Sequence, residues 1–329
     1  MAKTPSRQCR PTKHAPDVGD SAPFYFSGWT ASPSPAPAQV RANCWAVYTH
    51  KGAILSLYFQ EYGSNSAPTI VFLHGGGVSG WMWQPQIEQL SDYHCIVPDL
   101  PEQGDSIDGT PFTIQGSAEK IADLIRTRAH NGKAHVVGLS EGAQITLALL
   151  SLAPELIDHA IISSALIRPI PGGSLMTPKL IALSYHWFVA PLKNSDWWIR
   201  LNMKFAAGIP EKYYTEFSLS FKKITESGFV NLMVENQRFR LPQKLNQTKT
   251  PTLIISGKNE YAAMRQSAKD IASAIPNSSI YEVSHTRKMT VAEEHNWSIT
   301  TPELFTQTVR AWINDQPLPS NLHQLSVKR

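Results

Sequence analysis

The stretch "HVVGLSEGAQ", residues 135–144, decides the fold, because it places an apolar run, a serine between two glycines and the start of a helix within ten residues. Its centre, G-L-S-E-G around Ser140, has the pattern G-x-S-x-G. The pattern alone is weak, since glycine and serine are common in turns. Here Ser140 follows a predicted buried strand and precedes a predicted helix. Gly138 and Gly142 indicate a turn too tight for neighbouring side chains, so the context favours an exposed, reactive serine.

Apolar runs on both sides of this stretch predict further strands. A predicted hairpin at residues 44–63, turning at Lys51–Gly52, supplies two strands, and the other runs are "PTIVFL", "YHCIVPD", "AHVVGL", "HAIISSAL", "TPTLIISG" and "SSIYEVS". Continuous apolar runs are typical of strands buried on both faces. A segment with helical spacing, residues 113–132, lies between two of the runs. The alternation predicts an α/β fold, with a mostly parallel eight-stranded sheet and helices on both faces.

The regions outside this alternation predict the domain organisation. Residues 168–243 carry no buried-strand pattern and are rich in aromatic residues, which predicts a helical cap inserted after the sixth strand. The core then consists of residues 41–167 and 244–318. Residues 1–40 contain the run "ASPSPAPAQ" and are expected to be a disordered, proline-rich tail. Residues 319–329 are expected to be a C-terminal tail.

The overall composition limits the classes of partner. Of 329 residues, 42% are hydrophobic, and 30 basic against 26 acidic residues leave a formal net charge of +4. The sequence has no Lys/Arg-dense run with interleaved aromatics, so nucleic-acid binding is not expected. No apolar stretch has the length of a membrane span. The three scattered cysteines predict neither disulfides nor a metal site. We expect a cytoplasmic protein, and the sequence leaves its oligomeric state open.

The glycines after the "IVFL" run supply what a reactive serine needs for acyl chemistry. Such a serine requires a base, an acid that orients the base, and N–H donors for the developing oxyanion. In "HGGG", residues 74–77, the backbone N–H groups of Gly76 and Gly77 are candidate donors. The N–H of Glu141, at the start of the following helix, is the other candidate.

Candidates for the acid and the base follow the last two predicted strands. Glu260 lies in the loop after the seventh strand, and the competing loop after the sixth strand, "IISSALIRP", contains no Asp or Glu. His285 and His295 both follow the last strand. The local pattern does not separate the two histidines.

The ordered motifs "FLHGGG", "VPDLPEQGDS", "GLSEG", "GKNE" and "HNWSITTPELF" resemble the α/β-hydrolase superfamily, in its esterase- and lipase-like branch with a helical cap. The resemblance covers residues 45–315, and it implies the order Ser140, Glu260, His295 for the catalytic triad. Many members carry a proline seven positions after the catalytic histidine. Pro302 stands seven positions after His295, so the resemblance assigns the base to His295, with His285 as the alternative. The chain departs from the family where Glu294 replaces a glycine and Glu260 replaces the commoner aspartate.

The predicted nucleophile narrows the reaction. Dehalogenases and epoxide hydrolases of this superfamily use aspartate at the position of Ser140, so the resemblance argues against both. It implies hydrolysis of a carboxylic ester of a small molecule through a Ser140 acyl-enzyme, without a metal or cofactor. The same triad also serves carbon–carbon bond hydrolases, acyltransferases and cofactor-free lyases. A non-catalytic ligand-binding protein with this fold is a further alternative.

Overall fold

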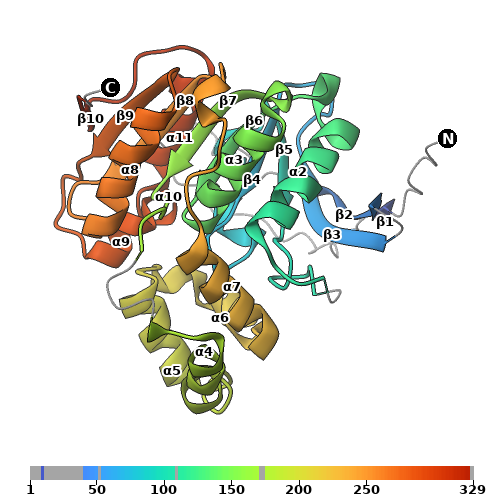
Figure 1. Cartoon of the computed structure of the whole chain (residues 1–329), viewed down its shortest axis with the longest axis vertical. Coiled ribbons are helices and arrows are strands. Elements are labelled where there is room, and N and C mark those ends of the chain that lie inside the picture. Colours follow the sequence, from blue (N-terminus) through green and yellow to red (C-terminus); the bar gives the residue numbers. More distant parts are fainter. Residues whose placement is uncertain (1–8, 11–39, 51–52, 108–109, 170–174, 327–329) are drawn as a thin grey trace, which may run out of the picture.

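The computed structural model describes residues 9–10, 40–50, 53–107, 110–169 and 175–326. Within these residues, ten strands form one sheet in the order β1-β2-β3-β5-β4-β6-β7-β8-β9-β10 (Figure 1). The strands are β1 (Cys9–Arg10), β2 (Val40–His50), β3 (Ala53–Tyr62), β4 (Thr69–Leu73), β5 (His94–Pro98), β6 (Ala134–Leu139), β7 (Ile157–Ser163), β8 (Thr252–Gly257), β9 (Ser278–Val283) and β10 (Leu322–Gln324). Strands β5, β4, β6, β7, β8 and β9 are parallel to one another. The eight predicted strands, β2–β9, and the mostly parallel α/β fold are therefore confirmed.

The two outermost strands are short additions to the predicted sheet. Strand β1 lies in the segment expected to be disordered and pairs antiparallel with β2, while the rest of residues 1–39 lies outside the described residues. Strand β10 lies in the expected C-terminal tail and pairs antiparallel with β9. Strands of two and three residues carry no periodicity that a sequence could reveal. Their pairing depends on an available sheet edge.

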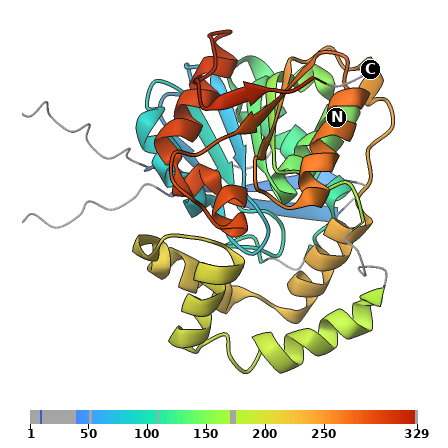
Figure 2. The same cartoon turned by 90° about the vertical axis from the view of Figure 1, so that its left-hand side faces the viewer.

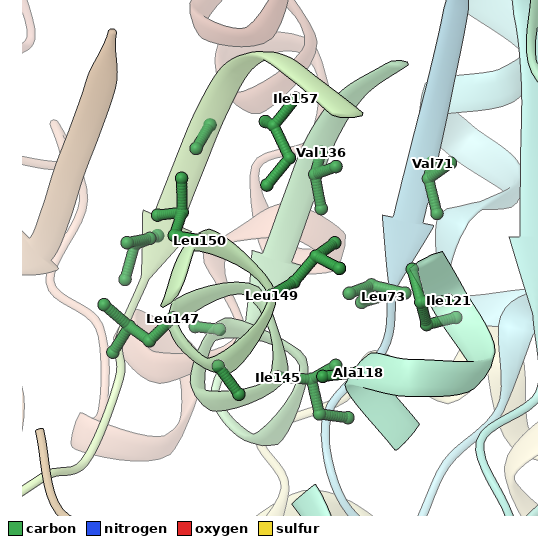
Figure 3. Packing of buried hydrophobic residues seen from close by; sticks show 14 of the residues in the cluster. Val71, Leu73, Ala118, Ile121, Val136, Ile145, Leu147, Leu149, Leu150 and Ile157 are labelled. Atoms are coloured by element: carbon green, nitrogen blue, oxygen red, sulfur yellow. The ribbon is translucent and has the colours of Figure 1, made fainter. Parts of the chain in front are cut away.

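Apolar side chains bury both faces of the sheet. In β4, Val71 and Leu73 belong to one buried cluster, whereas Ile70 and Phe72 belong to the other. The first cluster also contains residues of α2 (Ile114–Arg128), α3 (Glu141–Leu152) and α8 (Ala262–Ala274), and Figure 3 shows α2 and α3 packed against β4, β6 and β7. The second contains residues of α1 (Gln84–Gln89), α10 (Trp297–Thr300) and α11 (Pro302–Ile313). Helices on both faces are thus confirmed.

Helix α3 is buried along most of its length, with ten of its twelve residues buried. It therefore anchors the turn at its N-terminus rigidly against the sheet. Short 3₁₀ turns precede or join these elements at η1 (Gly80–Trp83), η2 (His130–Gly132) and η3 (Pro154–Leu156). Helix α11 begins at Pro302, and the preceding Thr301 hydroxyl donates to the Trp297 carbonyl oxygen instead of capping α11.

Only helices and turns connect β7 to β8 in the described part of residues 164–251. They are α4 (Pro178–Ser184), the π-helix η5 (Tyr185–Val189), α5 (Asp196–Leu201), the π-helix η6 (Asn202–Ala206), η7 (Glu211–Tyr213), α6 (Tyr214–Lys223), α7 (Glu226–Arg238) and η8 (Leu245–Gln247). Both views place α4–α7 beyond one end of the sheet (Figures 1 and 2). Ile199, Phe217 and Phe221 of this insertion join the second buried cluster. The division of the chain into core and cap domains stays a prediction.

In the part of the chain that the structure describes, no helix combines the length and the apolar character needed to cross a bilayer.

Candidate active site

Ser140 occupies a strained turn between β6 and α3. Its backbone has φ 55° and ψ −110°, a conformation that a non-glycine residue rarely adopts. The turn fits only because its flanking residues lack side chains: a Cβ on Gly138 would lie 2.4 Å from the Gly142 carbonyl oxygen, and one on Gly142 would lie 2.1 Å from that of Leu73. These contacts give the physical reason for both glycines of the G-x-S-x-G pattern.

The glycine turn after β4 lies against Ser140. A Cβ built on Gly75 would be 3.6 Å from the Ser140 Cβ. Buried His74 holds this turn: its Nε2 accepts a hydrogen bond from the Leu100 N–H at 2.9 Å, so its Nδ1 carries the proton and donates to the Gly75 carbonyl oxygen at 2.8 Å. Burial lowers the pKa of His74 to about 4, so its ring is neutral and structural at pH 7.

The structure corrects the set of candidate oxyanion donors. The N–H of Gly77 donates to Gln103 Oε1 at 2.9 Å and is therefore not free for a substrate oxygen. The N–H groups of Gly76 and of Glu141 have no hydrogen-bond partner among the described residues. The first N–H groups of a helix lack intrahelical partners, which explains why the Glu141 N–H is free. The sequence could not show that Gln103 reaches the glycine turn.

Glu260 and His295 form a close pair. His295 Nδ1 lies 2.6 Å from Glu260 Oε1. The other oxygen of this buried carboxylate accepts hydrogen bonds from the Ser164 hydroxyl and the Gly257 N–H, both at 3.0 Å. These bonds fix the orientation of the carboxylate toward the imidazole. No local pattern marks Ser164 as a partner of Glu260, because serine is common in loops and the two residues lie 96 positions apart.

His295 ends a short helix, α9 (Val291–His295). A capping box between Thr290 and Glu293 starts this helix. The buried Glu294 carboxylate accepts hydrogen bonds from the Asn259 N–H at 2.6 Å and from Asn259 Nδ2 at 2.8 Å. Glu294, which stands where the family commonly has glycine, therefore ties the loop that carries Glu260 to the helix that carries His295.

His285 lies apart from this pair. Both of its ring nitrogens are buried without a hydrogen-bond partner among the described residues, and its ring lies 6.4 Å from that of Trp297. Burial lowers the pKa of His285, which keeps the ring neutral. The carboxylate of Glu260 thus pairs with His295 and not with His285.

Ser140 and His295 line one cavity of about 270 Å³, together with the glycine turn and residues of the insertion. Its lining comprises Gly75, Gly76, Gly77, Val78, Ser140, Asn202, Ala206, Ala207, Ile209, Phe217, Phe221, Ile224, His295 and Asn296. The structure thus brings the predicted nucleophile, base and glycine turn to one cavity. A direct hydrogen bond from the Ser140 hydroxyl to His295 Nε2 stays a prediction.

A second cavity, of about 230 Å³, shares the glycine turn with the first. Its lining includes Val78, Ile224, Phe229, Leu232 and Met233, which are apolar. Leu232 packs directly on the turn, with its Cδ1 atom 3.1 Å from the position of a Cβ on Gly76. The two cavities therefore share Gly76, whose N–H is free, together with Gly77, Val78 and Ile224.

Comparison with known proteins identifies the family. The family model of the alpha/beta hydrolase fold matches residues 68–296. The chain is 26% identical over 268 residues to an AB hydrolase superfamily protein of Gibberella zeae, covering 79% of this chain and 85% of that protein. It is 24% identical over 265 residues to a putative carbamate hydrolase of Pseudomonas syringae pv. syringae, covering 76% and 95%.

Solved structures share the fold. The enol-lactonase of Burkholderia xenovorans LB400 matches with a TM-score of 0.64 at 21% identity, over 82% of this chain and 99% of that one. Residues 68–296, which match the family model, contain the turn at Ser140, the loop that carries Glu260 and the helix that ends at His295. The chain belongs to the α/β-hydrolase fold family, among its esterase- and lipase-like hydrolases.

Proposed function

We propose that this protein hydrolyses a carboxylic ester of a small molecule, with Ser140 as nucleophile, His295 as general base and Glu260 as the residue that orients the base. The observation that carries the proposal is the 2.6 Å contact between His295 Nδ1 and Glu260 Oε1, at a cavity that Ser140 also lines. A carboxylate on Nδ1 leaves Nε2 as the nitrogen that can take a proton from the serine.

The proposed reaction has two halves. The Ser140 hydroxyl attacks the ester carbonyl carbon while His295 Nε2 takes its proton, and the carbonyl oxygen becomes an oxyanion. The free N–H groups of Gly76 and Glu141 stabilise this oxyanion. Protonated His295 then gives its proton to the leaving alcohol, which departs from the acyl-enzyme. Water, activated by the same histidine, releases the acid and restores Ser140.

Labelling with a fluorophosphonate tests the central claim, because this reagent requires an activated serine. We expect wild-type protein to be labelled at Ser140, as read by mass spectrometry. A panel of esters, β-diketones and acyl acceptors then separates ester hydrolysis from carbon–carbon bond cleavage and acyl transfer on the same triad. An unlabelled serine would indicate a ligand-binding protein.

Substitution of Glu260 by glutamine is expected to lower kcat about 10³- to 10⁴-fold, with little change in KM. The amide keeps the shape of the side chain but cannot hold the imidazole in the same tautomer or stabilise its protonated form. Steady-state kinetics on a chromogenic ester measures both constants. Asp270→Asn, on the exposed salt bridge with Arg168, is the control for a lost carboxylate elsewhere. An unchanged kcat in Glu260→Gln would assign the acid to another residue.

We also propose that the insertion is a cap whose underside sets the choice of substrate. Helix α7 buries only Gly228 fully, while its apolar residues Phe229, Leu232 and Met233 line the second cavity. Apolar space left unfilled by protein costs stability, so such a cavity favours an apolar group of the substrate. Esters with short to medium acyl chains are therefore expected to react faster than charged substrates.

Met233→Trp tests this assignment by filling the second cavity. The larger side chain is expected to shift the preferred chain length downward by several carbons while leaving kcat/KM for an acetate ester within about threefold of wild type. Two series of p-nitrophenyl and alkyl esters, varying the acyl and the alcohol chain separately, show which group occupies the cavity. Ser227→Trp, on the exposed side of α7, is the matched control. An unchanged profile, or a preference for anionic esters, would contradict the assignment.

A further inference from the structure

A short chain of hydrogen bonds links the glycine turn to the turn at Ser140. The Gly77 N–H donates to Gln103 Oε1 at 2.9 Å, and Gln103 Nε2 donates to Glu141 Oε2 at 2.8 Å. Gln103 is 8% exposed and Glu141 is 2% exposed, so the bond between them is buried, while the bond to the Gly77 N–H is partly buried. One side chain from the loop after β5 therefore bridges the loop after β4 and the first residue of α3.

The two ends of this chain of hydrogen bonds, Gly77 and Glu141, lie beside the free N–H groups. Gly77 directly follows Gly76, and Glu141 contributes its own backbone N–H. A run of three glycines has wide conformational freedom, so its N–H groups point in one direction only where other residues hold them. His74 holds the turn at Gly75, and Gln103 holds it at Gly77. Between these two ties, the direction of the Gly76 N–H is fixed relative to Ser140.

Glu141 takes part in this chain as a neutral acid at pH 7. Burial raises its pKa to about 8. The hydrogen bond from Gln103 opposes this shift, and the negative charge of Glu235 on α7 adds to it. Glu141 Oε1 is buried and has no hydrogen-bond partner among the described residues. A negative charge on this carboxyl would be poorly solvated and would repel a developing oxyanion close by.

We infer that Gln103 and Glu141 are positioning residues, which hold the Gly76 and Glu141 N–H groups at the separation that an ester oxyanion requires. The inference rests on the proposed hydrolase function and adds to it two side chains that take no part in proton transfer. A carboxyl group directly after the nucleophile is compatible with oxyanion chemistry because burial favours its uncharged form.

Gln103→Met tests the hydrogen bonds, because methionine has a similar shape and makes neither of them. We expect kcat to fall about 10- to 100-fold, since a misplaced donor costs part of its stabilisation, while KM stays within about threefold. A trifluoromethyl ketone, which forms the oxyanion on Ser140, should lose affinity in proportion to kcat. Gln115→Met, an exposed glutamine on α2, is the matched control and should match wild type in both.

Glu141→Gln tests the charge, through the pH profile rather than the rate at one pH. In wild type, Glu141 ionises as the pH rises through about 8, so kcat should fall above that pH. Glutamine accepts the same bond from Gln103 but does not ionise, so this alkaline fall should disappear. Glu141→Met should reduce kcat more than Glu141→Gln at pH 7. Glu235→Gln removes the neighbouring charge that raises the pKa of Glu141, so the fall should move to lower pH.

Three outcomes separate the inference from the function on which it rests. A wild-type protein that hydrolyses no ester and is not labelled by fluorophosphonate contradicts the proposed function itself. A wild type that is active, with Gln103→Met at full kcat, overturns the positioning role alone. If Gln103→Met does not fold, as judged by circular dichroism, the pH profile of Glu141→Gln decides: an alkaline fall unchanged from wild type overturns the inference.

Discussion

Ser140→Ala is expected to lower the rate of ester hydrolysis at least about 10⁴-fold, because no other group in the cavity can form the acyl-enzyme. The substitution removes one oxygen from a half-buried side chain and leaves the glycines that shape the turn in place. Stability should therefore change little. Steady-state kinetics on a short-chain ester measures the loss, and thermal unfolding measures the stability.

The matching control is Ser151→Ala, on the same helix α3 but with its hydroxyl bonded to the Gln243 carbonyl oxygen at the surface. It should retain wild-type activity and fluorophosphonate labelling. Hydrolysis by Ser140→Ala at the wild-type rate, or continued labelling of that variant, would rule out Ser140 as the nucleophile.

His295→Ala is expected to lower kcat about 10⁴-fold or more, since the serine then keeps its proton and the leaving alcohol receives none. The buried Glu260 carboxylate also loses its partner, and some loss of stability should accompany the loss of rate. His295→Gln reduces this second effect, because a glutamine amide can donate to Glu260 but cannot act as a base. Both variants should be almost equally inactive.

His285→Phe provides the comparison that separates the two histidines. Its ring nitrogens make no hydrogen bond among the described residues, and phenylalanine retains an aromatic ring beside Trp297. We expect kcat within about threefold of wild type, as for substitutions outside functional contacts. An inactive, folded His285→Phe together with an active His295→Ala would assign the base to His285 and leave the proposed hydrolase function in place.

The amino-acid sequence by itself determined the sheet and the strained turn. Strands such as Thr69–Leu73 are buried on both faces, so nearly every residue must be apolar and the run is visible without any knowledge of its neighbours. The turn at Ser140 is equally local, because Gly138 and Gly142 are required by backbone contacts within a few residues or with the adjoining strand. Short-range requirements of this kind restrict the residue types at each position, so they can be recognised in the sequence.

Only the tertiary structure decided which side chains meet. It paired Glu260 with His295, showed that Gln103 occupies the Gly77 N–H, and gave Glu294 a partner in Asn259. Each of these contacts joins segments that follow different strands. Their partners lie 26 to 35 residues apart in the chain, so no local pattern records them. A hydrogen bond depends on the positions of both partners, and the packing of the whole sheet sets those positions.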